Sequence, residues 1–235
     1  MSVTLATESS RLQSAADVAA TTESIMNGVF EVQHPLIQCH LTRLRDKSTP
    51  PPEFRQLVHR LASLLAYEAT KDLRTNVVTV QTPLTKTGGH QLAQRIGLVP
   101  ILRAGLGMVE PVLELIPSAE VWHLGLYRDE ETAKPIKYYS KLPEERPVDV
   151  ALILDPMLAT GGSVVAALTT LRQWGVPQVK LLSLIAAEEG VKAVEAEFPD
   201  SQIYVCQIDP DLNDRKFIVP GLGDAGDRIF NTVPE

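Results

Sequence analysis

The sequence is poor in cysteine and in aromatic residues, and it has no long apolar run. Cysteine occurs only at Cys39 and Cys206, which are far apart and lack the spacing of metal ligands. This excludes a disulfide-rich secreted scaffold and favours free thiols in a reducing compartment. No apolar run approaches the ~20 residues that a membrane-spanning helix needs. With 44% apolar and 22% charged residues, the composition is typical of a soluble globular protein.

Basic residues are also in the minority. The chain carries 22 Lys and Arg against 29 Asp and Glu, which gives a net charge of −7. This balance argues against a general surface for nucleic acid or for an anionic membrane, although it allows a local basic pocket for a phosphorylated substrate. The 235 residues show no internal repeat and no sign of a second core, so we expect one α/β domain in residues 29–235.

Residues 1–28 differ from the rest, being rich in Ser, Thr and Ala. They lack the basic start and apolar block of a secretory signal. They contain one Arg and three acids, whereas a transit peptide is rich in Arg and poor in acids. We therefore expect a disordered or weakly helical extension, or else a structural one, on a cytoplasmic protein.

The most informative stretch begins with the apolar run Val150–Leu154, which predicts a buried strand. Asp155 ends this strand, the small residues Ala159–Ser163 follow, and the spacing of Val164, Val165, Leu168 and Leu171 predicts a helix. A small-residue loop before a helix turns several backbone N–H groups toward one point and therefore favours a bound phosphate. No Gly-Lys-Ser/Thr follows, so this is not a Walker loop. The alternative is an ordinary strand-to-helix turn.

A second strand, Leu98–Leu102, leads into Arg103 and a small-residue turn ending at Gly107. Ligands of open parallel sheets bind beyond the carboxyl ends of the strands, and an arginine there can grip a phosphate or pyrophosphate. The alternative is an arginine held in a salt bridge. A further strand, Val121–Tyr127, ends at Arg128, which we single out from the charged loop that follows it.

The third candidate site is the stretch Phe217–Arg228, which contains Pro-Gly-Leu-Gly at positions 220–223. Glycines there allow a flat ligand to approach the backbone closely, and exposed N–H and C=O groups could read the edge of a heterocycle. The alternative is a glycine-rich turn in which Asp227 caps a short final helix.

The remaining pattern predicts the fold class. Strands and helices alternate from Leu98 onward, which predicts an α/β doubly wound, mainly parallel sheet flanked by helices. Pro135–Leu142 is expected to be a β-arm or hood over a site or onto another subunit. We further expect a short strand at Val29–Val32 followed by a turn at His34–Leu36. A β-rich segment at Val77–Val80 should be followed by a polar loop.

Together these segments resemble the uracil phosphoribosyltransferase family, from about Phe30 to the C-terminus. The most specific parts of the resemblance are Val99–Gly107, Asp155–Ser163 and Ile218–Arg228. Most phosphoribosyltransferases close the central strand with two adjacent acids, whereas here Pro156 follows Asp155, as in the uracil branch. The departures from the family are the N-terminal extension, the 81–95 loop and residues 213–216.

The resemblance implies a type I phosphoribosyltransferase-like fold. It also implies the transfer of a phosphoribosyl group to uracil. Uracil and 5-phospho-α-D-ribose 1-diphosphate (PRPP) would give uridine monophosphate and pyrophosphate, as in pyrimidine salvage. It implies that Mg²⁺ arrives on PRPP, with no direct metal ligand from the protein. The implied catalytic residues are Arg103, Arg128, Asp155 and Asp224.

The resemblance also assigns roles. The Ala159–Ser163 backbone would hold the 5′-phosphate, Asp155 the ribose hydroxyls, and Arg103 with Arg128 the pyrophosphate. Asp224 would face PRPP, its Mg²⁺ shell or the N1 proton of uracil. The residues implied for PRPP are Arg103, Arg128, Asp155, Pro156, Met157, Leu158, Ala159, Thr160, Gly161, Gly162, Ser163 and Asp224. Those implied for uracil are Ile218, Gly223, Asp224 and Ala225.

Two other functions are left open by the residues. One is a phosphoribosyltransferase for another base, such as a purine. The other is a catalytically silent regulator that binds PRPP and RNA, against which the acidity of the chain counts. From the resemblance we expect small-molecule partners, no nucleic acid and no membrane. We also expect a homo-oligomer, a dimer or larger, and a GTP effector such as activates some members of the family.

Overall fold

The computed structural model describes residues 24–26, 28–128, 135–140, 142 and 145–232. Its centre is an eight-stranded sheet. Across the sheet the strands run in the order β1 (Ser24–Met26), β2 (Val29–Glu31), β12 (Gln202–Asp209), β11 (Gln178–Ala187), β9 (Val150–Leu154), β5 (Ile96–Pro100) and β6 (Glu120–Val121). The short strand β10 (Met157–Leu158) also pairs with β11. Only the pairing of β1 with β2 is antiparallel in this sheet as described, and the other pairings are parallel.

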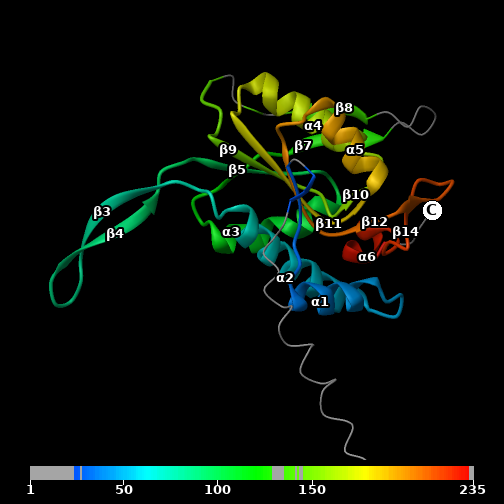
Figure 1. Cartoon of the computed structure of the whole chain (residues 1–235), viewed down its shortest axis with the longest axis horizontal. Helices are drawn as coiled ribbons and strands as arrows, with labels where there is room; N and C mark the ends of the chain where they lie inside the picture. The colour runs from blue at the N-terminus through cyan, green and yellow to red at the C-terminus, as the bar shows by residue number, and fades with distance from the viewer. Residues whose placement is uncertain (1–23, 27, 129–134, 141, 143–144, 233–235) are drawn as a thin grey trace, which may run out of the picture.

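Helices cover both faces of the sheet (Figure 1). One face carries α1 (Pro35–Arg45), α2 (Pro51–Ala69), α3 (Val109–Leu115) and α6 (Ala225–Phe230). The other carries α4 (Gly162–Trp174), α5 (Glu188–Glu197) and an antiparallel pair, β7 (Leu124–Arg128) with β8 (Pro135–Ser140). The predicted doubly wound parallel sheet with flanking helices is therefore confirmed, as is a β-excursion at residues 135–140.

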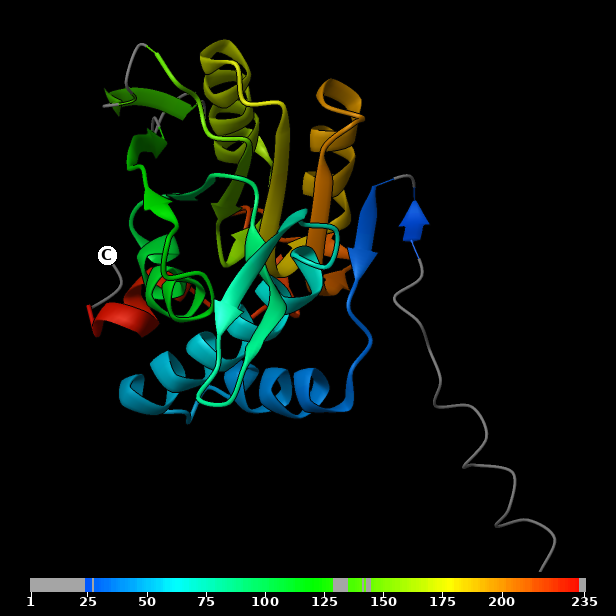
Figure 2. The ribbon, with the colours of Figure 1, turned by 90° about the vertical axis from the view of Figure 1, so that its left-hand side faces the viewer.

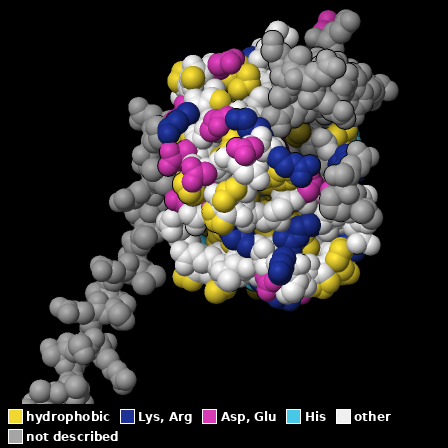
Figure 3. All heavy atoms as spheres, turned by 90° about the vertical axis from the view of Figure 1, so that its right-hand side faces the viewer, with side chains coloured by type: hydrophobic (Ala, Val, Ile, Leu, Met, Phe, Trp, Pro, Cys, Tyr) yellow, Lys and Arg dark blue, Asp and Glu magenta, His cyan; other side chains and the backbone are white. Residues whose placement is uncertain are grey.

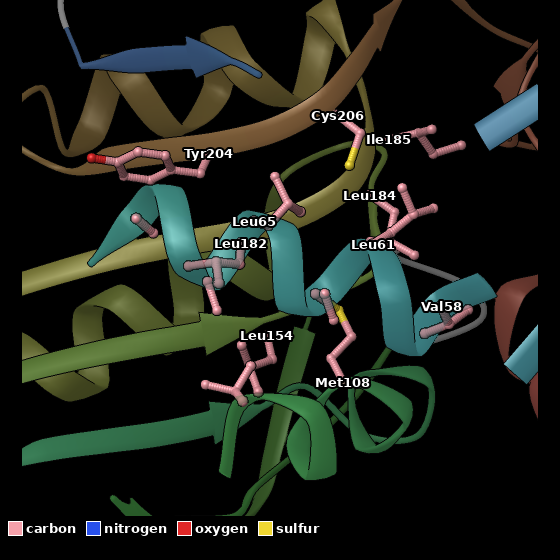
Figure 4. Close-up of a cluster of buried hydrophobic side chains, with 14 of the residues drawn as sticks. Val58, Leu61, Leu65, Met108, Leu154, Leu182, Leu184, Ile185, Tyr204 and Cys206 are labelled. Carbon is pink, nitrogen blue, oxygen red and sulfur yellow. The ribbon is translucent and has the colours of Figure 1, made fainter. Parts of the chain in front are cut away.

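The central strands are apolar because both of their faces are covered. All five residues of β9 are buried, and so are those of β5. Figure 4 shows α2 lying across the sheet, with Leu61 beside Leu184 and with Leu65, Leu182 and Leu154 in the same buried cluster. Full burial of each such leucine is worth ~1.5–3 kcal/mol, so this packing stabilises α2 against the sheet.

A charged side chain also lies in this core. Lys180, on β11, has 0% of its side chain exposed. Its ammonium donates a hydrogen bond of 2.6 Å to the Ala69 carbonyl and forms an ion pair with Asp72. Although partial burial works against ionisation, this partner keeps the pKa of Asp72 below its ordinary value. The pair fixes the C-terminal end of α2 to the amino end of the sheet.

Two expected segments differ in the structure. The turn expected at His34–Leu36 is the start of α1, where the His34 ring nitrogen Nδ1 accepts the Leu36 N–H at 3.1 Å. Pro35 occupies the first turn, where its missing N–H costs nothing. Ser24–Met26, placed in a disordered or weakly helical extension, forms strand β1 against β2. Residues 1–23 lie outside the described residues.

The polar loop expected after Val77–Val80 is a second strand. β3 (Thr75–Gln81) pairs along its whole length with β4 (Lys86–Leu92), forming a two-stranded hairpin. Figure 1 shows this hairpin extending away from the sheet and the helices, and in Figure 2 it lies in front of them, on the side that faces the viewer. β4 reads Lys-Thr-Gly-Gly-His-Gln-Leu and buries little, so its sequence lacks the apolar alternation by which a strand is recognised.

The strand expected at Val121–Tyr127 is divided into β6 and β7. The stretch 104–108, between β5 and α3, is a 3₁₀ helix, η1 (Ala104–Met108). A last small sheet joins β13 (Asp211–Leu212) to β14 (Ile218–Val219), just before α6. No helix in the described part of the chain is both long and apolar enough to cross a membrane.

Candidate active site

The site lies where the carboxyl ends of β9 and β5 meet. These strands are parallel neighbours, with Leu154 opposite Pro100. The chain leaving β5 stays in contact with the end of β9, because the Ile101 N–H donates to the Leu154 carbonyl at 3.0 Å. Gly105 is so close that a Cβ there would lie 2.2 Å from the same carbonyl. The turn that carries Arg103 and the loop that starts at Asp155 are therefore adjacent.

The loop after Asp155 surrounds a cavity of about 110 Å³, lined by Asp155 and by the run from Met157 to Val164. It ends at the N-terminus of α4, where Gly161 has φ +80° and provides no capping side chain. The first residues of this 13-residue helix line the cavity, and no N-cap side chain accepts from their N–H groups. They and the helix dipole make the cavity suitable for a phosphate group.

Two residues outside the predicted set shape this loop. The Ser183 hydroxyl donates to the Asp155 carbonyl at 2.7 Å and accepts the Leu158 N–H at 3.1 Å. A Cβ on Gly190 would lie 2.4 Å from the Ala159 carbonyl, so α5 packs directly on the loop. Ser183 and Gly190 lie beyond the recognisable motif, on β11 and α5, which explains why sequence reasoning missed them.

Asp155 sits at the edge of the cavity, partly exposed. Its Oδ1 accepts the Met157 N–H at 3.3 Å, and no cation pairs with it in the described part of the chain. Burial of the carboxyl raises its pKa to about 7, against the weaker opposite effect of the Met157 N–H. The carboxyl is thus able to gain or lose a proton near neutral pH. A cationic or hydroxyl-bearing ligand would favour its charged form.

Arg103 projects from the adjacent turn with 64% of its side chain exposed. The peptide bond before it, Leu102–Arg103, is cis. Its Nη2 lies 3.6 Å from Asp227 Oδ1, the salt bridge that we considered as an alternative role. Exposed pairs of this kind contribute only ~0–1 kcal/mol, so the guanidinium is readily available to a phosphate or pyrophosphate.

The start of α6 lies against the same turn, since a Cβ on Gly226 would be 4.0 Å from Arg103 Nη2 and 3.9 Å from the Ala104 Cβ. The cap of this helix is Asp224, whose Oδ1 accepts the Asp227 N–H at 2.8 Å. The alternative in which Asp227 is the cap is therefore wrong. The sequence offers aspartate at both positions, and only the point where the backbone turns helical distinguishes them.

The stretch before α6 has the irregular backbone expected for a site that reads a flat ligand. Gly221 has φ +60° and Gly223 has φ +81°. A Cβ on Gly221 would lie 2.0 Å from the Ile218 carbonyl, so this position requires glycine. Of the residues implied for uracil, Ile218 and Ala225 are buried, whereas Gly223 and Asp224 are exposed.

The structure thus places the three predicted segments in one chain of direct contacts, with the Arg103 turn in the middle. The Asp155 loop touches the Arg103 turn, which touches the start of α6. Arg128 is the exception, because only its backbone is described, at the end of β7. Its role in binding pyrophosphate stays a prediction, as do the other residue roles.

Charge on this side of the molecule is mixed. Figure 3 shows acidic and basic side chains interspersed on the face that carries α5 and α6, with no single basic stripe. Among the residues that the structure describes, no group of three or more His, Cys, Asp or Glu side chains could hold a metal ion. A metal carried by the substrate would therefore depend on fewer contacts than a resident ion has.

Comparisons with known proteins agree with this geometry. A family model described as Uracil phosphoribosyltransferase matches residues 31–232. The chain is 60% identical over 207 residues to a protein of Roseiflexus sp. (strain RS-1) named uracil phosphoribosyltransferase, covering 88% of this chain and 100% of that one. A protein of the same name from Symbiobacterium thermophilum is 54% identical over 208 residues, with the same coverage.

A solved structure agrees as well. The AQ2163 protein from Aquifex aeolicus has a TM-score of 0.82 to this chain at 40% identity, covering 87% of this chain and 98% of that one. The matched range contains the Asp155 loop, the Arg103 turn and the Gly221–Gly223 turn. The chain therefore belongs to the uracil phosphoribosyltransferase family.

Proposed function

We propose that the protein transfers the 5-phosphoribosyl group from PRPP to N1 of uracil, releasing pyrophosphate and forming uridine monophosphate for pyrimidine salvage. The observation that carries this proposal is the contact between the Asp155 loop and the Arg103 turn, with the start of α6 on the far side of that turn. The names of the 54–60% identical relatives support uracil as the base. The substrate is the Mg²⁺ complex of PRPP.

In this proposal the α4 N-terminus holds the 5′-phosphate, with the Thr160 and Ser163 hydroxyls assisting. The Asp155 carboxylate accepts hydrogen bonds from the ribose hydroxyls. Arg103 and Arg128 bind the pyrophosphate, where negative charge grows as the bond to the anomeric carbon loosens. Catalysis then consists mainly of positioning the two substrates and stabilising the leaving group.

Asp224 has a double role in the proposal. One carboxylate oxygen caps α6 through the Asp227 N–H. The exposed carboxylate faces the donor, its Mg²⁺ shell or the N1 proton of uracil. Since the cap fixes the side chain, the carboxylate is held in one orientation.

Uracil lies against Ile218 in this proposal, and backbone groups at Gly223 and Ala225 read its edge. Uracil has an N3–H donor and a C4 carbonyl acceptor, whereas cytosine has the opposite groups at both places. A fixed N–H aimed at O4 would meet the amino group of cytosine and lose its partner. Such a mismatch at a site that hydrogen-bonds its substrate lowers kcat/KM by as much as ~10⁴-fold.

The proposal is tested by an assay of nucleotide formation from PRPP with a panel of uracil, cytosine, hypoxanthine and guanine. We expect uridine monophosphate as the main product, in the absence of RNA. Turnover of a purine but not of uracil would replace uracil by a purine as the substrate. PRPP binding without turnover of any base would instead favour a regulator.

We also propose that the protein is a homo-oligomer, supported by the β3–β4 hairpin. A two-stranded hairpin is at best marginally stable in water. This one nevertheless exposes apolar side chains, with Leu84 94% and Val77 78% exposed. A second copy of the chain that covers them would bury this surface. A GTP effector, expected from the family alone, is tested by running the same assay with and without GTP.

The reaction is placed in the cytoplasm in this proposal. The support is the state of the two cysteines, since Cys206 is buried, Cys39 is exposed, and neither forms a disulfide. Free thiols of this kind are usual in a reducing compartment. Separation of a native cell extract into soluble and membrane fractions, followed by the uracil assay, measures the location.

A further inference from the structure

Two arginines donate hydrogen bonds to the backbone of the Gly221–Gly223 turn. Arg228, on α6, donates from Nη1 to the Leu222 carbonyl at 2.8 Å. Arg45, in the last turn of α1, donates from Nη1 to the Gly221 carbonyl at 2.7 Å. Two consecutive carbonyls of the turn thus accept hydrogen bonds from guanidinium groups that lie 176 and 6 residues away in the chain.

Each guanidinium is in turn fixed by other groups. Arg45 forms a two-point pair with Asp209, with N–O distances of 2.7 and 2.8 Å, and Asp209 Oδ2 also accepts the Gly221 N–H at 3.0 Å. Arg228 donates to the Leu44 carbonyl at 2.8 Å and to the Asp46 carbonyl at 2.7 Å, and stacks 4.2 Å from the Phe54 ring centre. The end of α1, β12 and α6 are therefore joined through the turn.

The Arg45–Asp209 pair is largely removed from water, with only 5% of the Asp209 side chain exposed. Buried ion pairs seldom stabilise a fold more than apolar side chains of the same size would, because desolvation offsets their attraction. Such a pair does fix the orientation of its side chains, since a planar guanidinium and a carboxylate fit together in one geometry. The pair is thus better explained by what it orients than by stability.

The orientation of the N–H groups in the turn follows from the planarity of the peptide bond. The Gly221–Leu222 and Leu222–Gly223 bonds are trans, so the C=O and N–H of each peptide point in opposite directions. Arg228 draws the Leu222 carbonyl inward and thereby turns the Gly223 N–H outward. Within the described residues, this N–H makes no hydrogen bond, and Gly223 is exposed. The Leu222 N–H is turned in the same way by Arg45.

We propose that Arg45, with Asp209, and Arg228 are positioning residues that aim the Gly223 N–H at the base and so set the discrimination between uracil and cytosine. This inference rests on the proposed uracil site. None of the three side chains is proposed to touch the substrate. They act through the carbonyls of the turn, so their loss affects recognition of the base and leaves the Asp155 loop intact.

The test compares Arg45→Lys with Arg43→Lys, a matched control on the same helix. Arg43 forms a similar two-point pair, with Glu53, at 2.7 and 3.1 Å, but does not touch the turn. Lysine keeps the positive charge but cannot make the two parallel hydrogen bonds of a guanidinium group. For Arg45→Lys we expect KM for uracil to rise by about ten-fold or more, and the uracil-to-cytosine ratio of kcat/KM to fall by a similar factor. PRPP binding, measured by calorimetry, should be unchanged, and the control should match the wild type.

Hydrogen exchange of a peptide that spans residues 218–226 gives a readout independent of activity. We expect faster exchange in Arg45→Lys, and also in Asp209→Asn and Arg228→Lys, which serve if the first variant does not fold. Unchanged uracil KM, base ratio and exchange would overturn the positioning role. An equal loss of uracil and PRPP binding would also overturn it, since that indicates general damage. A wild type that forms no uridine monophosphate would instead refute the proposed function.

Discussion

Asp155 combines a structural cost with a proposed role in binding. Its carboxyl has a pKa of about 7 in the folded protein, raised by burial from an ordinary value of about 3.9. Between these values the folded protein keeps a proton that the unfolded chain has released. The contribution of this group to the free energy of unfolding is therefore lost as the pH rises from about 4 to about 7.

We expect Asp155→Asn to become more stable relative to the wild type as the pH rises through this window, because asparagine does not titrate. Urea unfolding of both proteins at about pH 5 and about pH 8 measures the difference. Parallel pH profiles would contradict the raised pKa. Turnover should be reduced in the same variant at about pH 8, where the wild-type carboxyl is charged, since the amide cannot supply the anionic oxygen proposed to hold the ribose.

Arg103 tests the proposed pyrophosphate site. The side chain is mostly exposed and its pair with Asp227 is long, so Arg103→Ala should leave the unfolding free energy almost unchanged. Turnover of uracil should fall by about two orders of magnitude or more, because a charge that stabilises the leaving group is lost. Steady-state kinetics and thermal unfolding measure the two effects. Wild-type turnover in this variant would remove Arg103 from the site.

Gly190 links α5 to the phosphate loop. In Gly190→Ala the new methyl group would lie 2.4 Å from the Ala159 carbonyl, so the loop must move. We expect weaker PRPP binding and a loss of ~1–3 kcal/mol in the free energy of unfolding. Gly88→Ala is the control, because a Cβ there has no atom within 4 Å. Equal PRPP affinity in the two variants would show that α5 does not shape the loop.

At the scale of elements, the β3–β4 hairpin gives a test of the proposed homo-oligomer. Leu84, at its tip, is 94% exposed, so Leu84→Lys should not disturb the fold of a single chain. If the hairpin packs on a second copy, a lysine at the tip must be desolvated there and should shift the oligomer toward smaller species. Sedimentation velocity measures the shift.

The control for this prediction is Leu36→Lys, on α1. Leu36 is also an exposed leucine, with 53% of its surface accessible, but it lies outside the hairpin. It should leave the sedimentation profile unchanged. A profile unaltered by Leu84→Lys as well would exclude the hairpin tip from the interface.

Sequence patterns predicted elements where local rules decide the structure. β9, its small-residue loop and α4 followed from an apolar run, flexible residues and helical spacing. β4 could not be recognised, because it is a polar strand whose partner is β3 alone. α1 was missed because His34 and Pro35, taken for a turn, are its cap and first residue.

At the scale of the whole molecule, contacts between distant segments were beyond the sequence. The motifs predicted which loops bear the site, and the sheet topology then brought the Asp155 loop and the Arg103 turn together. Nothing in the sequence around Arg45 indicates a bond to Gly221 and Asp209, which lie 176 and 164 residues away. Supporting residues of this kind carry no local motif, so they were found only from the structure.

The Lys180–Asp72 pair, whose lysine is buried and whose aspartate is 46% exposed, has a consequence for behaviour on heating. It closes the amino end of the sheet, whereas the carboxyl end is built from glycine turns. The cost of desolvating charged groups falls as the temperature rises, so the contribution of this pair to the free energy of unfolding grows. The entropic cost of holding flexible glycine turns in one conformation also grows with temperature, and this opposes folding at the carboxyl end. The two ends of the sheet therefore diverge in stability with temperature, and thermal inactivation should begin in the substrate-binding turns before the fold itself is lost.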